Sequence, residues 1–167
     1  MQKTDKTLPH NISTVYNLRN DEIVKFLNSC IPTDNPRFEL RALTKLLKTK
    51  GDWILYKENE VIMAIAFLAS NVLGVNDTYI LEFQTIKKGY GKALLNVILD
   101  HYTNVWLLSY IEASDSLLEY YQQFKLNEFV LEHCEFGGDS TAHFFYQESF
   151  DKAVFEKIIT DKYQLKG

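Results

Sequence analysis

Hydrophobic residues recur along this chain with two different periods. Short apolar runs, and runs in which apolar and polar residues alternate, predict β-strands. Such runs occupy residues 12–16, 53–56, 61–68, 78–83, 105–112, 129–134 and 141–146. The run 61–68 is apolar on both faces, which is typical of a strand in the centre of a sheet.

Other segments place apolar residues on one side of a helix. They cover residues 22–29, 38–50, a stretch from the glycines at 89 and 91 to about residue 102, a stretch that begins near residue 114, and residues 151–160. A helix therefore separates the strands at 78–83 and 105–112, so we expect those two strands to be parallel. The order β-α-α-β-β-β-α-β-α-β-β predicts one α+β domain with a mixed, twisted sheet of six or seven strands and a further C-terminal helix.

Composition narrows the classes of protein that fit this pattern. The chain has 167 residues, of which 46% are hydrophobic and 14% aromatic, which is enough for a core of its own. The net charge of −4 argues against a general nucleic-acid or anionic-membrane partner. The two cysteines, Cys30 and Cys134, lack metal or redox spacing and are expected to be reduced and buried. The polar N-terminus and the lack of a long apolar run predict a cytoplasmic protein.

A basic glycine turn joins the strand at 78–83 to the helix that follows it. Segment 86–92 reads IKKGYGK. Glycine allows the backbone to come close to a ligand, and the first turn of a helix offers unpaired N–H groups, so the segment predicts a cradle for a phosphate or pyrophosphate. The alternative is an ordinary tight turn before a solvated basic helix. The spacing matches neither the dinucleotide fingerprint nor the P-loop.

The order of elements, with the glycine turn after the fourth strand, resembles the GNAT superfamily of acyl-CoA-dependent N-acyltransferases. The family signature is Gln/Arg-x-x-Gly-x-Gly/Ala at the start of the central helix. Gly89 and Gly91 match its glycines, the following residues 92–95 (KALL) are typical, and Ile86 stands where Gln or Arg is usual. The resemblance covers residues 10–149, which leaves 1–9 as an N-terminal tail and 150–167 as a C-terminal helical extension.

A second landmark lies in the helix after the fifth strand. Family members often carry a tyrosine there, and Tyr121 falls on that position. Ser114, Leu117 and Lys125 stand where Asn, Ala and Gly are usual. In this helix the resemblance therefore rests on the spacing and on the tyrosine.

The resemblance implies a site for acetyl-CoA as co-substrate, with no metal. Tyr121 is implied as the general acid to the CoA thiolate, and Glu82 is the candidate general base, ahead of Glu112. The backbone of the fourth strand is implied to pair with the pantetheine arm. The implied cofactor-binding residues are Phe83, Gln84, Thr85, Ile86, Lys87, Lys88, Gly89, Tyr90, Gly91, Lys92 and Ser114. We expect structural roles for His101, His133 and His143.

Three functions remain open at this level. The first is transfer of an acetyl group from acetyl-CoA to an amine, on a small molecule or a protein, by direct attack. The second is a GNAT-fold interaction or regulatory protein with weak or no catalysis. In that case the C-terminal helix is a candidate surface for a partner or a homodimer, although packing on its own domain is the simpler expectation. The third is acetylation of charged tRNA, which the acidic balance disfavours.

Overall fold

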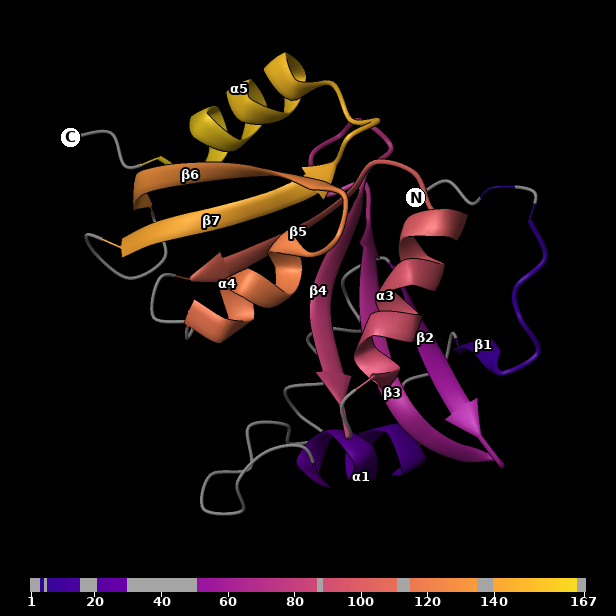
Figure 1. The fold of residues 1–167 in the computed structure, drawn as a ribbon. Coiled ribbons are helices and arrows are strands. Elements are labelled where there is room, and N and C mark those ends of the chain that lie inside the picture. Colours follow the sequence, from indigo (N-terminus) through magenta and orange to yellow (C-terminus); the bar gives the residue numbers. More distant parts are fainter. Residues whose placement is uncertain are drawn as a thin grey trace.

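The computed structural model contains one mixed β-sheet with helices on both faces (Figure 1). It describes residues 4, 6–15, 21–29, 51–86, 89–110, 115–134 and 140–164. The elements are β1 (Ile12–Val15), α1 (Asp21–Ser29), β2 (Gly51–Glu58), β3 (Val61–Ser70), β4 (Thr78–Thr85), α3 (Tyr90–His101), β5 (Val105–Tyr110), α4 (Asp115–Gln122), β6 (Leu126–Cys134), β7 (Ser140–Gln147) and α5 (Lys152–Tyr163). The helix predicted over residues 38–50 lies outside the described residues.

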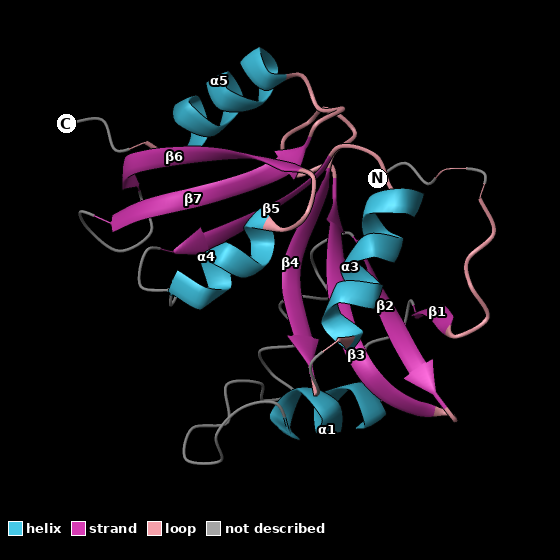
Figure 2. Cartoon of the chain, in the orientation of Figure 1, coloured by secondary structure: helices cyan, strands magenta, loops and turns pink. Residues whose placement is uncertain are grey.

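The sheet has seven strands in the order β1-β2-β3-β4-β5-β7-β6. Every neighbouring pair is antiparallel except β4 and β5, which are parallel. The predicted α+β class, the seven-stranded mixed sheet and the parallel pair are therefore confirmed. Figure 2 shows α3 as the helix that connects the two parallel strands.

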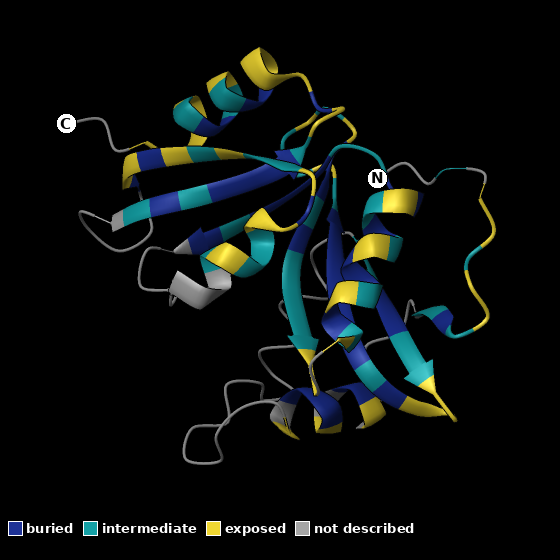
Figure 3. Ribbon diagram, viewed as in Figure 1, coloured by how far each residue is buried: buried dark blue, intermediate teal, exposed yellow. Residues whose placement is uncertain are grey.

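The hydrophobic core has three parts because the sheet is covered on both faces. On one face, α3 places Leu94, Leu95 and Ile98 against the strands, and α4 adds Tyr121. On the opposite face, α1 packs over β2 and β3, and α5 packs over β5, β6 and β7. Figure 3 shows the result as buried strands beneath helices that expose only their outer sides.

Both ends of the chain pack against the domain in the residues that are described. The backbone N–H of Thr4 donates to the carbonyl oxygen of His101 at 2.8 Å, and Lys6 pairs with Asp100. At the other end, Phe155 and Ile159 of α5 are fully buried. The C-terminal helix thus packs on its own sheet, which confirms the expectation that it packs on its own domain.

Candidate active site

Strands β4 and β5 are joined at one end and separated at the other. They pair only through Thr78 with Val105 and Tyr79 with Trp106, and we call these two pairs the joint. Beyond them the strands diverge, as Figure 1 shows. We call the diverging part, residues 80–85 of β4 and 107–110 of β5, the split. Beyond the joint the two facing strand edges form no ladder with each other, so their backbone groups could pair with an extended ligand.

A buried carboxyl group holds the joint together. Asp77 is fully buried; its Oδ2 accepts a hydrogen bond from Nε1 of Trp106 at 2.8 Å, and its Oδ1 accepts one from the N–H of Leu73 at 2.9 Å. The indole of Trp106 also stacks on Tyr79, with ring centroids 4.0 Å apart. The joint is therefore fixed by buried hydrogen bonds as well as by the strand ladder.

A β-bulge lies in β4 where the split begins. Leu68 of β3 pairs with Ile80 and Phe67 pairs with Glu82, so Leu81 is an extra residue without a partner in β3. A bulge bends the strand and increases its twist, which turns β4 away from β5. Residues that pair directly share a face, so Glu82 lies with Phe67 on the face covered by α1.

The backbone of β4 directs part of its hydrogen-bonding groups toward the split. The N–H of Ile86 donates to the carbonyl oxygen of Met63 at 3.0 Å, so this peptide group points toward β3. Successive residues of a strand direct their groups to opposite edges, so the N–H and C=O of Phe83 point toward the split. This arrangement suits a ligand that adds an extended segment beside β4.

The glycine turn has the geometry expected of a cradle for an anion. Gly89 caps α3 with φ of 99° and ψ of −36°, a conformation that disfavours any side chain, and no side-chain cap hydrogen bond forms. The first helical bond runs from the N–H of Ala93 to the oxygen of Gly89. The earlier N–H groups, those of Tyr90, Gly91 and Lys92, therefore stand at the positive end of the helix. Lys87, Lys88 and Ser114, also predicted to bind the cofactor, lie outside the described residues.

Gly91 is a point of close contact between α3 and the sheet. A Cβ at this position would lie 3.1 Å from the hydroxyl of Tyr120 and 3.3 Å from side-chain atoms of both Phe83 and Thr85. The second glycine of the turn therefore serves close packing of α3 on β4. Ile86, in contrast, is 48% exposed at the start of the turn.

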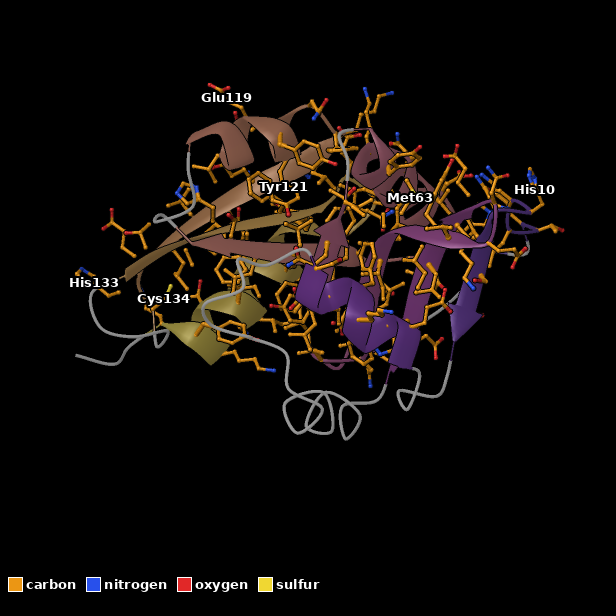
Figure 4. All side chains as sticks on the ribbon, turned by 90° about the horizontal axis from the view of Figure 1, so that it is seen from below. His10, Met63, Glu119, Tyr121, His133 and Cys134 are labelled. Carbon is orange, nitrogen blue, oxygen red and sulfur yellow. The ribbon has the colours of Figure 1, made fainter. Side chains whose placement is uncertain are left out.

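Tyr121 lies between α4 and the sheet, beside the split. Its ring packs 5.4 Å from that of Phe145 on β7. Figure 4 shows Glu119 projecting outward from α4 whereas Tyr121 lies on the inner side. Burial, followed by the charges of Tyr120 and Glu82, raises the pKa of Tyr121 to about 12. The charge of Glu82 is the smallest of these causes, so Glu82 lies near enough to Tyr121 to influence its pKa.

Tyr120, which the sequence did not single out, also belongs to this site. Its hydroxyl approaches Gly91, its ring packs against those of Tyr121 and Phe124, and burial raises its pKa. It connects α4 to the first turn of α3. Hydrophobic periodicity does not distinguish it from its neighbour, because both tyrosines fit the apolar side of the helix, and the spacing of the resembling family selects only Tyr121.

The other predicted residues separate into two groups. The side-chain amide of Gln84 donates to Glu82 at 2.9 Å, so these two lie together. Tyr90 turns toward β2 instead: its ring is 5.6 Å from that of Tyr56, and a hydrogen bond with Glu58 is the main reason its pKa is raised. Tyr90 thus offers its backbone to the turn while its side chain packs elsewhere.

Lys92 points into a cavity of about 510 Å³ between α3 and the end of α4. Asn96 and Asp100 of α3 line it on one side, and Phe124 and Lys125 line it on the other. The cavity begins beside the first turn of α3, so it can hold a group attached to an anion bound there.

The histidines differ in their surroundings. His101 is buried at the end of α3, with its ring nitrogens 2.9 Å from the oxygen of Val97 and 3.2 Å from that of Thr7, which agrees with the structural role expected. His143 on β7 lies 2.7 Å from Oε1 of Glu128 on β6. His133, the residue before the end of β6, has a positive φ of 56°.

Solved structures of several acetyltransferases have the same fold as this chain. A ribosomal-protein-alanine N-acetyltransferase from Escherichia coli aligns with a TM-score of 0.58 at 12% identity, over 81% of this chain and 92% of that one. The aminoglycoside 6′-N-acetyltransferase from Enterococcus faecium gives 0.60 at 10% identity, over 81% and 95%. A spermidine N-acetyltransferase chimera that includes the Vibrio cholerae enzyme gives 0.61 at 14% identity, over 82% and 95%.

The resemblance inferred from the glycine turn is therefore confirmed as a shared GNAT fold, and it designates no particular member. No family model and no curated protein matches the sequence. Identities of 10–14% establish the fold alone.

Two further findings concern the described part of the chain. None of its helices is long and apolar enough to cross a membrane. Within those same residues, no group of three or more His, Cys, Asp or Glu side chains is placed to hold a metal ion.

Proposed function

We propose that this protein is an N-acetyltransferase that moves an acetyl group from acetyl-CoA to an amine by direct attack. The observation that carries the proposal is the split, which opens one residue after the joint and ends beside the uncapped first turn of α3. The edge of β4 and the N-terminus of α3 then bind two parts of one long ligand. The names of the similar structures cover several amines, so the fold does not choose the acceptor.

Acetyl-CoA would be held mainly by backbone groups. The peptide group of Phe83 pairs with the pantetheine arm along β4, and the N–H groups of Tyr90, Gly91 and Lys92 receive the pyrophosphate. Such binding depends on chain conformation more than on side chains, so Ile86 in place of Gln or Arg does not remove it.

The cavity beside Lys92 suits the adenosine end of the ligand. Lys92 and Lys125 supply positive charge there, Asp100 and Glu148 also line the cavity, and Phe124 supplies apolar surface. Lys125→Ala should therefore weaken binding of CoA by about threefold and leave binding of dephospho-CoA unchanged. Equal weakening of both ligands in calorimetric titrations would place the 3′-phosphate elsewhere.

The reaction needs a donor for the oxyanion, a proton donor for the sulfur and a base for the amine. A backbone N–H of β4 that faces the split would polarise the thioester carbonyl. Glu82, which the bulge places on the α1 face, would accept the amine proton directly or through water. The acceptor would then approach from the α1 face, while acetyl-CoA lies on the α3 side.

Tyr121 fits the role of donor to the departing sulfur. Its pKa of about 12 keeps the phenol protonated at neutral pH. An ordinary thiol has a pKa of about 8.5, so complete transfer of the phenol proton to a thiolate would be uphill by about 5 kcal/mol. Tyr121 therefore assists mainly by a hydrogen bond to the developing thiolate, which strengthens as charge develops.

One experiment tests the proposal directly. Acetyl-CoA should raise the melting temperature of the protein, and an amine screen that follows release of free CoA should then find an acceptor. A melting temperature unchanged by acetyl-CoA and by every other acyl-CoA would refute the proposal.

That negative result would favour the second candidate, an interaction or regulatory protein with the same fold. One observation supports this alternative: the hydroxyl of Tyr120 already lies against Gly91, so α4 contacts the turn that would receive the pyrophosphate. Analytical ultracentrifugation would then ask whether the chain forms a homodimer.

A further inference from the structure

Three polar residues from three neighbouring strands meet on the face of the sheet that carries α4. Ser109 of β5 pairs directly with His143 of β7, and Glu128 of β6 lies next to His143 on its other side. Leu107 and Phe145 form the adjacent pair on the same face and belong to the core beneath α3 and α4. Figure 2 shows the three strands side by side with α4 next to them.

Glu128 fixes the orientation of the His143 ring. The distance from Nδ1 of His143 to Oε1 of Glu128 is 2.7 Å, and the side-chain amide of Gln122 donates to Oε2 of Glu128 at 3.2 Å. The hydrogen bond from His143 is the main reason that the pKa of Glu128 is lowered. A carboxylate only accepts, so Nδ1 carries the proton, and Nε2 of the neutral ring is then the basic atom.

Ser109 carries a hydroxyl that the fold leaves unused. The residue is 4% exposed, and its Oγ has no hydrogen-bond partner among the residues that the structure describes. A buried hydroxyl without a partner costs about 1–3 kcal/mol. Directly paired residues have Cβ atoms about 4.5–5.5 Å apart, so rotation of the Ser109 hydroxyl brings it within reach of the His143 ring.

The distance of Ser109 from the joint, measured along β5, also suits a role in the split. Ser109 is the third residue after Trp106 in β5, and Glu82 is the third residue after Tyr79 in β4. Strands advance about 3.3 Å per residue, so Ser109 lies about 10 Å from the joint. Glu82 lies somewhat nearer to the joint on the opposite wall of the split, because the bulge at Leu81 adds a residue without a full step along β4. A thioester carbonyl held against β4 near the bulge therefore faces the wall that carries Ser109.

We propose that Ser109, His143 and Glu128 form a second reactive centre, in which Ser109 is a nucleophile that gives the chain acyl-CoA hydrolase activity in the absence of an amine. The inference rests on the proposed function, because it takes acyl-CoA in the split as its substrate. Ser109 and His143 are its catalytic residues. Glu128 is a positioning residue, because it acts through His143.

The chemistry balances without any further reactant except water. Oγ of Ser109 attacks the thioester carbon while Nε2 of His143 takes the hydroxyl proton; the C–S bond breaks, and the CoA thiolate receives that proton. Water then attacks the acyl ester, His143 takes a proton from the water, and the released Ser109 oxygen regains it. The net reaction converts acyl-CoA and water into the carboxylic acid and CoA.

The test measures release of free thiol from acetyl-CoA in the absence of any amine, together with peptide mass spectrometry of samples quenched during turnover. The wild-type protein should release thiol and carry an acetyl group on Ser109. Ser109→Ala and His143→Gln should lower the rate by about 100-fold. Ser13→Ala, which removes a hydroxyl from β1 at the edge of the sheet, is the matched control and should leave the rate unchanged.

Further variants guard against a merely structural effect. Removal of an unpaired buried hydroxyl should leave the melting temperature of Ser109→Ala equal or higher. Ser109→Cys restores a nucleophile and should trap an acetyl thioester. Glu128→Gln should lower kcat with KM changed by about twofold or less, and Glu128→Asp should recover part of the loss.

The outcomes separate this inference from the proposed function. If acetyl-CoA raises the melting temperature and amines are acetylated, but Ser109→Ala releases thiol without amine as fast as the wild type, only the reactive centre is refuted. The same holds if the acetyl group is found on another residue. If no acyl-CoA shifts the melting temperature, the proposed function fails, and this inference fails with it.

Discussion

The two ends of the β4–β5 pair differ in how completely their polar groups are hydrogen-bonded. At the joint, neighbouring groups satisfy one another: the side chain of Gln147 accepts from the N–H of Val105 and donates to the oxygen of Leu99, and Asp77 bonds to Trp106. At the split, β4 and β5 no longer pair with each other, the first turn of α3 has no side-chain cap, and the hydroxyl of Ser109 has no hydrogen-bond partner among the described residues.

This contrast separates stability from function along one pair of strands. Buried groups that are paired stabilise the fold, and groups that remain unpaired there are costly unless a ligand satisfies them. We therefore expect substitutions at the joint to change the free energy of unfolding, and substitutions at the split to change binding and turnover.

The largest effect is expected at Asp77. Asp77→Ala leaves the buried indole N–H of Trp106 and the partly buried backbone N–H of Leu73 without their acceptor, so the free energy of unfolding should fall by about 3 kcal/mol. Urea unfolding measures this change. Asp77→Asn keeps one acceptor oxygen and should lose less. A fall in acetyl-CoA affinity of more than about threefold in the folded variant would contradict the expectation that the joint affects stability and not binding.

The next effect concerns the phenol of Tyr121. Tyr121→Phe should lower kcat by about 100-fold while KM for acetyl-CoA changes little, because the hydrogen bond forms mainly in the transition state. Steady-state kinetics at saturating acceptor measures both. A rise in KM at constant kcat would instead make Tyr121 a binding residue.

Tyr121 also predicts a dependence of stability on pH. Its folded pKa of about 12 lies above the ordinary value of 10.0. The neutral phenol therefore stabilises the fold fully below pH 10.0, and this contribution, about 2–3 kcal/mol, is lost as pH rises toward 12. Other buried tyrosines behave similarly, so the measurement is the difference in unfolding free energy between wild type and Tyr121→Phe; a constant difference would contradict the assignment.

Gly89 and Gly74 form a matched pair for the glycine turn. Both have positive φ, 99° and 79°, and a Cβ at either would meet nothing within 4 Å. Alanine at either position should therefore cost about 1–2 kcal/mol of stability through backbone strain alone. Only Gly89→Ala should also weaken acetyl-CoA binding, by about tenfold, because it alone shapes the first turn of α3. Calorimetric titration of both variants decides this, and equal affinities would remove the turn from the site.

Ile86 should give the smallest effect. Ile86→Gln introduces the residue usual in the resembling family at a position that is 48% exposed. Since backbone groups dominate the expected contacts, acetyl-CoA affinity should rise by only about threefold. A much larger gain would show that the side chain at this position, rather than the turn, controls binding.

The sequence predicted the fold because its signals are local. Amphipathic periods set the elements, and the helix between residues 83 and 105 required the parallel pair. The glycines at 89 and 91 showed where α3 begins. Two details have no local signal in the sequence. The segment around Leu81 reads as an ordinary strand although it contains the bulge, and the backbone groups of Thr4 and Thr7 bond to His101 of α3.

The candidate site was predictable only where its residues belong to a pattern that is local in the sequence. Gly89, Gly91 and Tyr121 are spaced along a recognisable pattern. Ser109, Glu128 and His143 come together through strand pairing between distant segments, and their register depends on the whole sheet. No pattern in one segment encodes that meeting, so only the structure shows it. The roles of Tyr121 and Glu82, and the domain limits at 10 and 149, stay predictions.

The two tryptophans give the protein a pair of optical reporters. Trp106 stacks on Tyr79 and donates to Asp77. Trp53 lies in the core beneath α1, and its buried indole N–H has no hydrogen-bond partner within the described part of the chain. An indole in an apolar environment emits at shorter wavelength than one bonded to a carboxyl group. Trp53→Phe and Trp106→Phe should therefore yield two single-tryptophan proteins with distinct emission maxima. The emission of Trp53, kept in Trp106→Phe, would report on β2 and β3, and the emission of Trp106, kept in Trp53→Phe, would report on the joint from which β4 and β5 diverge.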